Sequence, residues 1–482
     1  MKINAESRVF SPAKIFAACL AVYVILTVAF YFLAGEQLRL RDSRGNIAQS
    51  APDLGGVELV QGTVVEQAFT AEIQRLESVS VQWGTYYRPN AGTIAMELLE
   101  TASGEVLMSG AFDAAAVAEG QILTIYSEEP IETVYQVPLI LRVYSDSLSG
   151  SAAAPLLSST EQEESWQLHV NGSPIEGSLC FSAAGTDYIW TGLHYWKFVI
   201  GFGVALALAF LVILERQKRG MHSYVINALI AVQKYSFLIR QLVSRDFKTK
   251  YKRSVLGMLW SFLNPLLMMI VQYFVFSTLF KSDIPNYPVY LLIGIISFNF
   301  FSEACGMALT SILGNASLIT KVYMPKYIYP LTRVMSSVIN LAISLIPLLI
   351  VSVVTGMRFE KSVVLALYFL VCLVIFSLGL GLLLSASMVF FRDTQFLWGV
   401  LNTIWMYATP IFYPESILPE NFKFVHQVNP LYHFLKNARI CVMDGISPEP
   451  VIYVQCMVIA LAMLMVGALV FRKTQDRFVL YL

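Results

Sequence analysis

The sequence lacks the short motifs of the common ATPases, proteases and esterases. It contains neither GxxxxGKS nor GxxxxGKT, so the chain has no P-loop with which it could itself hydrolyse ATP in the usual way. The motifs HExxH and GxSxG and an Asp-x-Asp pair are absent as well. We therefore expect no catalytic residue in this chain.

Metal ligands are also scarce. The six cysteines form no CxxC pair, and only Cys180 lies between the first two long apolar runs, so neither a disulfide framework nor a thiolate metal site is indicated. The histidines are scattered without ligand spacing and fit interface or turn positions more simply; they are His169, His194, His222, His426 and His433. We expect no metal and no cofactor in this chain.

Lysine is missing from a long stretch near the N-terminus. From Glu36 to Gly192 there are 21 acidic residues, six arginines and no lysine, whereas Glu215 to Val255 holds ten basic residues and two acids. Since basic loops stay in the cytoplasm, the acidic stretch is predicted to lie outside. The basic charge therefore needs no nucleic-acid partner to explain it.

Apolar residues dominate the rest. Of the 482 residues, 56% are hydrophobic and 14% charged, and the mean hydropathy is +0.62, which predicts a polytopic helical membrane protein. Basic residues after alternate runs favour an even number of spans with both termini cytoplasmic. About eight runs qualify: 15–34, 194–214, 255–280, 289–313, 331–355, 363–391, 396–412 and 451–471.

The first run follows a predicted cytoplasmic tail, residues 1–14. With about 19 apolar residues it exceeds the usual core of a signal peptide, about 7–15, so an uncleaved anchor is favoured over cleavage near Ala34. The second run, 194–214, holds the acidic stretch at its other end.

Residues 35–192 are predicted to form an all-β domain. Short alternating runs separated by turn signals favour an antiparallel sandwich, for example of the jelly-roll type. The predicted strands are Val79–Trp83, Thr93–Leu98, Gln121–Tyr126, Leu139–Tyr144 and Trp166–Val170. Asn171-Gly172 predicts a tight hairpin turn, and 145–165 predicts an exposed loop.

Residues 215–254 are predicted to be a cytoplasmic linker that ends in a basic amphipathic helix. Apolar residues recur at helical spacing from Tyr235 to Val255, with Lys248, Lys250, Lys252 and Arg253 around them. Such a helix is best placed flat in the headgroup layer. The alternative is a positive cluster beside the membrane without another role.

The last predicted domain, 255–482, has six spans interrupted by a proline-rich stretch. Pro414, Pro419, Pro430 and Pro448 bound pieces too short to cross about 30 Å of hydrocarbon. Two short re-entrant helices, forming a gate at about 412–448, fit this pattern. An ordinary outside loop is the alternative.

Five separated pieces of the membrane half occur in a distinctive order. They are Arg245-Asp-Phe-Lys through Asn264-Pro265, Asn315 through Pro330, Phe391-Arg-Asp393, Thr409 through Pro419, and Asn429-Pro430 through Gly445. In these, residues 223–482 resemble the membrane subunit of type-2 ABC exporters for cell-surface polysaccharides, the O-antigen and teichoic-acid permeases. The stretch 15–214 is not part of that pattern.

The resemblance implies a channel-forming permease that moves a lipid-linked polysaccharide across the cytoplasmic membrane of a bacterium. It implies a homodimer with two copies of a separate ATPase, which would bind the ATP and Mg²⁺. Two alternatives stay open: a type-2 ABC exporter of a drug or small amphiphile, and a non-transporting receptor whose β domain senses glycans.

The resemblance also implies two sets of site residues. A coupling element that docks on the ATPase corresponds to Asn315, Leu318, Lys321, Val322, Tyr323, Met324, Pro325 and Lys326. An interface helix, near which a lipid diphosphate headgroup enters, corresponds to Arg245, Lys248, Lys250, Tyr251, Lys252 and Arg253. Their cations suit charge-assisted hydrogen bonds to phosphate.

A glycan path should be aromatic, because sugar C–H faces pack on aromatic planes. The candidates for lining it at the dimer seam are Tyr273, Phe276, Phe298, Phe301, Trp398, Trp405, Tyr407, Phe412 and Tyr413. Glu303 is a lone acid within an apolar run, which is functional by default unless a neighbouring helix simply binds it.

Overall fold

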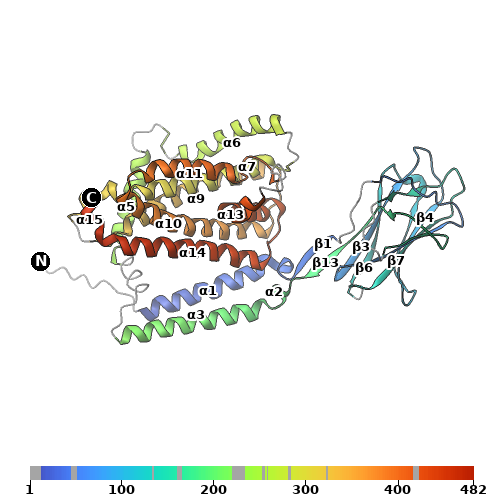
Figure 1. Ribbon diagram of the computed structural model, residues 1–482, viewed down its shortest axis with the longest axis horizontal. Helices are drawn as coiled ribbons and strands as arrows, with labels where there is room; N and C mark the ends of the chain where they lie inside the picture. The colour runs from blue at the N-terminus through green and yellow to red at the C-terminus, as the bar shows by residue number, and fades with distance from the viewer. Residues whose placement is uncertain are drawn as a thin grey trace. The chain divides into compact units, whose positions relative to one another are not determined.

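The computed structural model divides the chain into two compact units, each with its own packing (Figure 1). The helical unit comprises Met1–Gln37 and His194–Leu482, and the β unit comprises Leu38–Leu193. The structure describes residues 12–44, 52–132, 135–159, 166–219, 234–251, 256–257, 259–280, 284–321, 324–415 and 423–481.

Seven helices of the described helical unit are long and apolar enough to cross a membrane. Runs of straight-chain and branched apolar residues satisfy their own backbone hydrogen bonds only as helices, which is why lipid selects this form. The helices are α1 (Pro12–Ala34), α3 (Tyr195–Lys218), α6 (Leu259–Phe280), α7 (Tyr287–Leu309), α9 (Ile328–Val354), α10 (Ala366–Phe390) and α14 (Pro450–Thr474). The prediction of a polytopic helical membrane protein is confirmed.

The remaining helical elements are short and join or flank these spans. They are α5 (Ser236–Tyr251), η3 (Leu313–Asn315), α8 (Ala316–Ile319), η4 (Lys361–Leu365), α11 (Thr394–Ala408), α12 (Lys423–Val428), α13 (Pro430–Arg439), the π-helix η7 (Ile440–Asp444), η8 (Gln475–Arg477) and α15 (Phe478–Tyr481).

The count of about eight full-length spans is corrected at the run 396–412. There the structure has α11, whose 15 residues reach about 22 Å, less than the hydrocarbon thickness of about 30 Å. The chain leaves the helix at Thr409 because Pro410 follows, and Pro414 prevents its resumption. Helix α11 is therefore too short to span alone.

Helix α7 is the centre of the helical unit. It packs against α6, α9, α10, α11 and α13, and most of its residues are buried; Asn299 is exposed and Glu303 is half-buried. Helices α10 and α14 approach so closely that a Cβ on Gly467 would lie 1.9 Å from the carbonyl oxygen of Gly379. Small residues at such crossings let helix backbones touch in a membrane.

Helices α1 and α3, which the β unit separates in the sequence, pack side by side. The hydroxyl of Tyr23 donates to the carbonyl of Val199 at 2.8 Å, and the Phe16 and Phe210 rings lie 4.2 Å apart. The far end of α1 packs on α14, where the Phe30 and Tyr453 rings meet edge to face at 4.8 Å. The pair of helices thus runs beside α14. The start of α1 and the end of α3 lie at the end of the unit that carries α5 and α15 (Figure 1).

The β unit contains two larger antiparallel sheets. One has the order β1-β13-β3-β6, with β8 beside β3, and the other has the order β11-β10-β2-β7-β4-β5; β9 pairs with β12. The strands are β1 (Leu40–Arg44), β2 (Val64–Thr70), β3 (Arg75–Gly84), β4 (Thr93–Glu100), β5 (Val106–Asp113), β6 (Ile122–Ile131), β7 (Pro138–Ser145), β8 (Ala154–Pro155), β9 (Leu157–Ser158), β10 (Leu168–Val170), β11 (Ser173–Ile175), β12 (Ser178–Leu179) and β13 (Phe181–Tyr188).

Alternating side chains from both sheets fill one core. Val79 and Val81 of β3 lie in the same buried cluster as Leu139 and Leu141 of β7. All five predicted strands are confirmed as β3, β4, β6, β7 and β10. Strand β2 was missed because Gln67 interrupts its apolar alternation on the core face. That buried amide is satisfied, since its Oε1 accepts the amide of Leu179 at 3.0 Å.

The predicted hairpin turn is confirmed. Asn171 and Gly172 join β10 to β11, and their φ values are 49° and 78°. Asn and Gly are the residues that most readily take positive φ in a two-residue hairpin turn.

Candidate functional site

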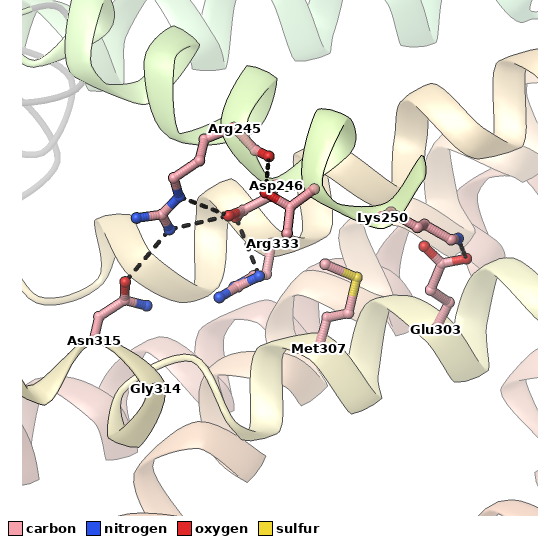
Figure 2. A pocket seen from close by; sticks show the side chains of 9 residues that line it. Arg245, Asp246, Lys250, Glu303, Met307, Gly314, Asn315 and Arg333 are labelled. Atoms are coloured by element: carbon pink, nitrogen blue, oxygen red, sulfur yellow. Dashed lines mark hydrogen bonds and ion pairs between the residues drawn. The ribbon is translucent and has the colours of Figure 1, made fainter. Parts of the chain in front are cut away.

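A cavity of about 720 Å³ lies where the amphipathic helix α5 meets the core of the helical unit (Figure 2). It gathers side chains from α5, α7, η3 and α9, which are far apart in sequence. Its lining consists of Arg245, Asp246, Thr249, Lys250, Glu303, Met307, Gly314, Asn315 and Arg333. We call it the α5 pocket.

One side of the α5 pocket is built around a buried carboxylate. Asp246 is 7% exposed, and its Oδ1 accepts from Nε and Nη2 of Arg245 at 3.1 and 3.0 Å. Nη1 of Arg333 forms an ion pair with Oδ2 at 3.4 Å. Asp246 therefore anchors two guanidinium groups, one of which, Arg245, stays half exposed at the pocket edge.

The other side is built around Glu303. Its Oε2 accepts from Nζ of Lys250 at 2.8 Å, and its Oε1 accepts from Nδ2 of Asn340 at 2.7 Å. Ser337 donates to the same Oε1 at 3.4 Å. The carboxylate within the span is thus bound by Lys250 of α5 and by Asn340 and Ser337 of α9, as the alternative of a bond to a neighbouring helix expects. A role of Glu303 in a glycan path stays a prediction.

The charges of the α5 pocket do not cancel. Three cations face two carboxylates, and each cation keeps more donors than its carboxylate uses. Arg245 and Lys250 are accessible from solvent. Such an arrangement can bind an anion by exchanging internal ion pairs for external ones. Among the described residues, no group of three or more His, Cys, Asp or Glu could hold a metal.

The predicted interface residues divide into two sets. Arg245 and Lys250 line the α5 pocket, whereas Lys248 is exposed on the same helix and is not part of the lining. Tyr251 ends α5. Lys252 and Arg253 lie outside the described residues.

The predicted coupling residues divide as well. Asn315 lines the α5 pocket, and Leu318 and Met324 pack into the core at this end of the unit. Lys321 is exposed just beyond α8. Val322 and Tyr323 lie outside the described residues. The exposed residues between Gly314 and Lys321 are Gly314, Ser317, Thr320 and Lys321, whereas Asn315 and Met324 are buried.

The C-terminal end of the chain supports this segment, a contact that the motifs did not predict. Lys326, next to the half-buried Pro325, donates to the carbonyl of Gln475 at 2.6 Å and lies over the Phe478 ring. Phe478 is fully buried in the same core as Met324. The apolar residues that follow Arg477 could have indicated this contact, because apolar residues after a charged stretch are often buried.

The aromatic candidates also separate by burial. Phe298, Phe301 and Trp398 pack inside the subunit, and Phe301 contacts Trp405 at 5.2 Å between ring centroids. Their burial within one subunit removes them from a seam between copies. Tyr273 and Tyr407 are exposed, the latter by 63%. Phe412 stacks on Phe276 at 5.6 Å, and Tyr413 donates to the carbonyl of Tyr407.

At the other end of the unit, the turn after α11 is held by a buried arginine. Arg439, 6% exposed, donates to the carbonyls of Pro410, Ile411 and Tyr290 at 2.6, 3.1 and 3.1 Å. Its guanidinium lies 3.4 Å from the centroid of the Tyr290 ring. No acid pairs with it in the part of the chain that the structure describes. We call this arrangement the Arg439 clamp.

The motif Asn429-Pro430 supports the same turn. The Asn429 side chain caps α13 by accepting from the amide of Leu431, and it also accepts from Nε1 of Trp405 at 2.8 Å. Its Nδ2 donates to Thr409. The short helices α12 and α13 occur where two re-entrant helices were expected; residues 416–422 of the predicted gate lie outside the described part.

Comparison with known proteins covers part of the helical unit. Residues 238–443 match the family model of the ABC-2 type transporter. Over 242 residues the chain is 30% identical to an O-antigen export system permease protein RfbA of Klebsiella pneumoniae, covering 50% of this chain and 93% of that protein.

Two further relatives match a similar length of the chain. An O-antigen export system permease protein RfbA of Myxococcus xanthus is 27% identical over 256 residues, 53% of this chain and 98% of its own length. A polysialic acid transport protein KpsM of Escherichia coli is 26% identical over 246 residues, 49% and 93% of the two chains. With nearly the whole of such relatives covered, the chain belongs to the ABC-2 type transporter family of membrane proteins.

Proposed function

We propose that this chain is the channel-forming permease subunit of an ABC exporter that moves a lipid-linked polysaccharide across the cytoplasmic membrane. The observation that carries the proposal is the match to nearly the full length of O-antigen and polysialic acid transport proteins. ATP would be bound, with Mg²⁺, by a separate ATPase present in two copies. Two copies of this chain would form the channel.

The α5 pocket supports the proposal because it suits a diphosphate headgroup. Arg245, Lys250 and Arg333 present cationic donors at the end of the unit where basic residues gather. Phosphate oxygens compete well for such donors, since charge-assisted hydrogen bonds to phosphate are strong. Lys250 would exchange Glu303 for the headgroup when the lipid arrives.

The polysaccharide would pass along the seam between two copies. The exposed aromatic rings of Tyr273 and Tyr407 offer planes for sugar faces, and the stacked Phe276 and Phe412 lie at the clamped turn. The short helices α12 and α13 would form the re-entrant gate of the outer mouth. Helix α11 would complete its crossing through the turn after Thr409, which gives eight crossings.

The ATPase would dock on the segment from Gly314 to Lys321, through its exposed residues Gly314, Ser317, Thr320 and Lys321. Because Asn315 lies in this segment and also lines the α5 pocket, a push on the segment would reach the headgroup site directly. The β unit would lie outside the membrane, since its charge is acidic while the basic residues gather beside α5 and α15. Both termini would be cytoplasmic.

The test is to replace Lys250 by alanine in the cell that carries this protein and to follow the polymer. Loss of one phosphate contact should reduce export about tenfold, and lipid-linked polymer should accumulate inside. Lys248→Ala is the matched control, because it removes the same charge from the same helix outside the α5 pocket. Normal export in Lys250→Ala, or an equal defect in Lys248→Ala, would contradict the headgroup site.

Depletion of the whole protein tests the broader function. Accumulation of a lipid-linked polysaccharide on the cytoplasmic side is expected. If instead no lipid-linked glycan changes and sensitivity to a small amphiphile rises, the chain exports a different class of molecule.

A further inference from the structure

The β unit contains a turn whose sequence is wrong for its backbone. Between β3 and β4 the chain reverses at Thr85 to Arg88, closed by the amide of Arg88 donating to the carbonyl of Thr85 at 3.2 Å. The two central residues are Tyr86 and Tyr87, and both have φ of 53°. We call this the tyrosine turn.

The same unit shows what this backbone normally requires. Asn171-Gly172 also has two adjacent positive φ values, with the residues that adopt them readily. Bulky residues with positive φ are strained, and such strain persists only where the surroundings enforce it. Asn or Gly at these two positions would give a more stable turn, so the two tyrosine side chains are not explained by the needs of the backbone.

The surroundings do enforce it. The carboxylate of Glu119 accepts from the amide and hydroxyl of Thr85 at 2.6 and 2.7 Å. On the other side, Arg88 is paired with Glu58 and donates to the carbonyl of Ala152 at 3.2 Å. The Tyr86 hydroxyl donates to the carbonyl of Gly56 at 2.8 Å. The turn is thus a fixed platform and not a loose loop.

What the platform presents is an aromatic face. Tyr87 is 90% exposed, and the Tyr86 ring, 47% exposed, is backed by the Arg88 guanidinium at 5.1 Å. Nothing in the fold of the described β unit uses the Tyr87 ring. A solvent-facing tyrosine on a fixed backbone suits a pyranose ring, because its aromatic plane is available for stacking.

We propose that the tyrosine turn binds a neutral glycan. The exposed aromatic plane favours a sugar ring as the ligand, and the acidic charge of the unit favours an uncharged sugar over an anionic one. From Glu36 to Gly192 the acids outnumber the arginines 21 to six, and there is no lysine, so the unit repels anionic polymers. The proposal extends the exporter function, on which it partly rests, by placing a site for the uncharged chain on the β unit.

The experiment uses the full-length protein in lipid nanodiscs. Dextran, mannan and galactan oligosaccharides are the neutral probes, hyaluronan oligosaccharides are the acidic probe, and polysaccharide purified from the source strain is included. We expect saturation-transfer contacts from at least one neutral probe and none from hyaluronan. Binding of hyaluronan alone, or of no glycan, would overturn the proposal; capture of a protein by the same turn would replace it.

Variants then locate the site. Tyr87→Ala should weaken binding about tenfold, whereas Tyr87→Phe should keep most of it. Tyr126→Ala is the matched control, because Tyr126 is 73% exposed in the regular strand β6 of the same unit. Equal losses in Tyr87→Ala and Tyr126→Ala, or none in Tyr87→Ala, would contradict the assignment.

A further variant separates binding from folding. Tyr87→Asn should resist thermal unfolding of the β unit better than the natural protein, since Asn tolerates positive φ, and yet bind about tenfold more weakly. A structural tyrosine would lose stability instead. If export stays normal while Tyr87→Ala loses glycan binding, the site and the exporter function are distinguished.

Discussion

The two ends of the helical unit bury charge in opposite ways. In the α5 pocket, Asp246 and Glu303 each face a cation, so every buried charge has an ionic partner. In the Arg439 clamp, one fully buried cation is held by three carbonyl oxygens and an aromatic ring. The first arrangement is exchangeable, because an incoming anion can replace a carboxylate. The second is not, because no mobile ion can replace backbone carbonyls of a turn.

This difference indicates different roles for the two ends. Ion pairs that open to solvent suit a place where a charged ligand enters and leaves. A guanidinium buried against neutral dipoles suits a turn that must keep its shape, since its desolvation is offset only while the three carbonyls and the ring stay in place. We therefore expect replacements at the clamp to damage the fold first and replacements in the α5 pocket to damage transport first.

The largest effect is expected from Arg439→Met. The change leaves the carbonyls of Pro410, Ile411 and Tyr290 buried without their donors, which should destabilise the protein by about 3 kcal/mol or more. It should also release the turn that carries Phe412, and export should be lost. Thermal unfolding in detergent and polymer export would measure the two effects.

Lys436→Met is the matched control for the clamp. Lys436 lies one turn earlier on α13 and pairs with Glu415 at 3.0 Å, but both side chains are partly exposed. Because exposed pairs contribute at most about 1 kcal/mol, stability should change little. Equal destabilisation by the two variants would show that Arg439 contributes no more to stability than a partly exposed ion pair.

Asp246→Asn should have the next largest effect. The neutral amide cannot compensate Arg245 and Arg333, so two close cations would repel each other at a site where the carboxylate is buried. We expect a loss of about 2 kcal/mol in stability, which high salt should partly restore. A loss of stability that does not respond to salt would show that Asp246 stabilises the protein through packing and not through its charge.

Glu303→Gln tests whether an incoming phosphate replaces Glu303 as the partner of Lys250. The side-chain amide of this variant could still accept from Asn340, but it would release Lys250 from its ion pair. Stability should fall by only about 1 kcal/mol, while binding of a diphosphate probe should become tighter. Titration of the purified protein with inorganic pyrophosphate or a lipid diphosphate would measure this. Weaker binding would mean that Glu303 orients Lys250 and does not compete for it.

The sequence carried much of the fold and less of the site, for a physical reason that particular residues illustrate. Alternation predicted β3 and β7 because one side of each faces water, and it failed at β2, where the buried Gln67 interrupts the pattern. Aromatic residues occur both inside the helical unit and on its surface, so the sequence did not distinguish the buried Phe301 of α7 from the exposed Tyr407 of α11.

The clamp was hidden more completely. The partners of Arg439 are backbone carbonyls, which every residue carries, so no side-chain pattern could reveal them. The pockets and pairs that join α5 to α7 and α9 likewise depend on tertiary packing. Lys248 and Lys250 look alike in a sequence, yet only Lys250 reaches Glu303. Periodicity predicts which elements form, whereas the register between elements decides which charges meet.

The smallest effect is expected at Glu119, which adds a third arrangement to the comparison. Like Arg439 it is held by neutral groups, the hydroxyl and amides of the tyrosine turn, but unlike Arg439 it is exposed. Hydrogen bonds from the Thr85 hydroxyl and then from backbone amides lower the pKa of Glu119. A lowered pKa means that its contribution is present above the unfolded pKa of about 4.3 and is lost as the pH falls through the folded value.

Replacing Glu119 by glutamine should therefore lower the melting temperature of the β unit slightly at neutral pH. The difference from the natural protein should shrink as the pH is lowered from about 6 to about 3, because the carboxyl of the natural protein becomes protonated. Glu105→Gln, which changes an exposed carboxylate of the same unit away from the tyrosine turn, is the matched control. A difference that stays constant with pH would mean that shape, and not charge, lets Glu119 hold the strained tyrosines, and the contrast with the buried clamp would then rest on burial alone.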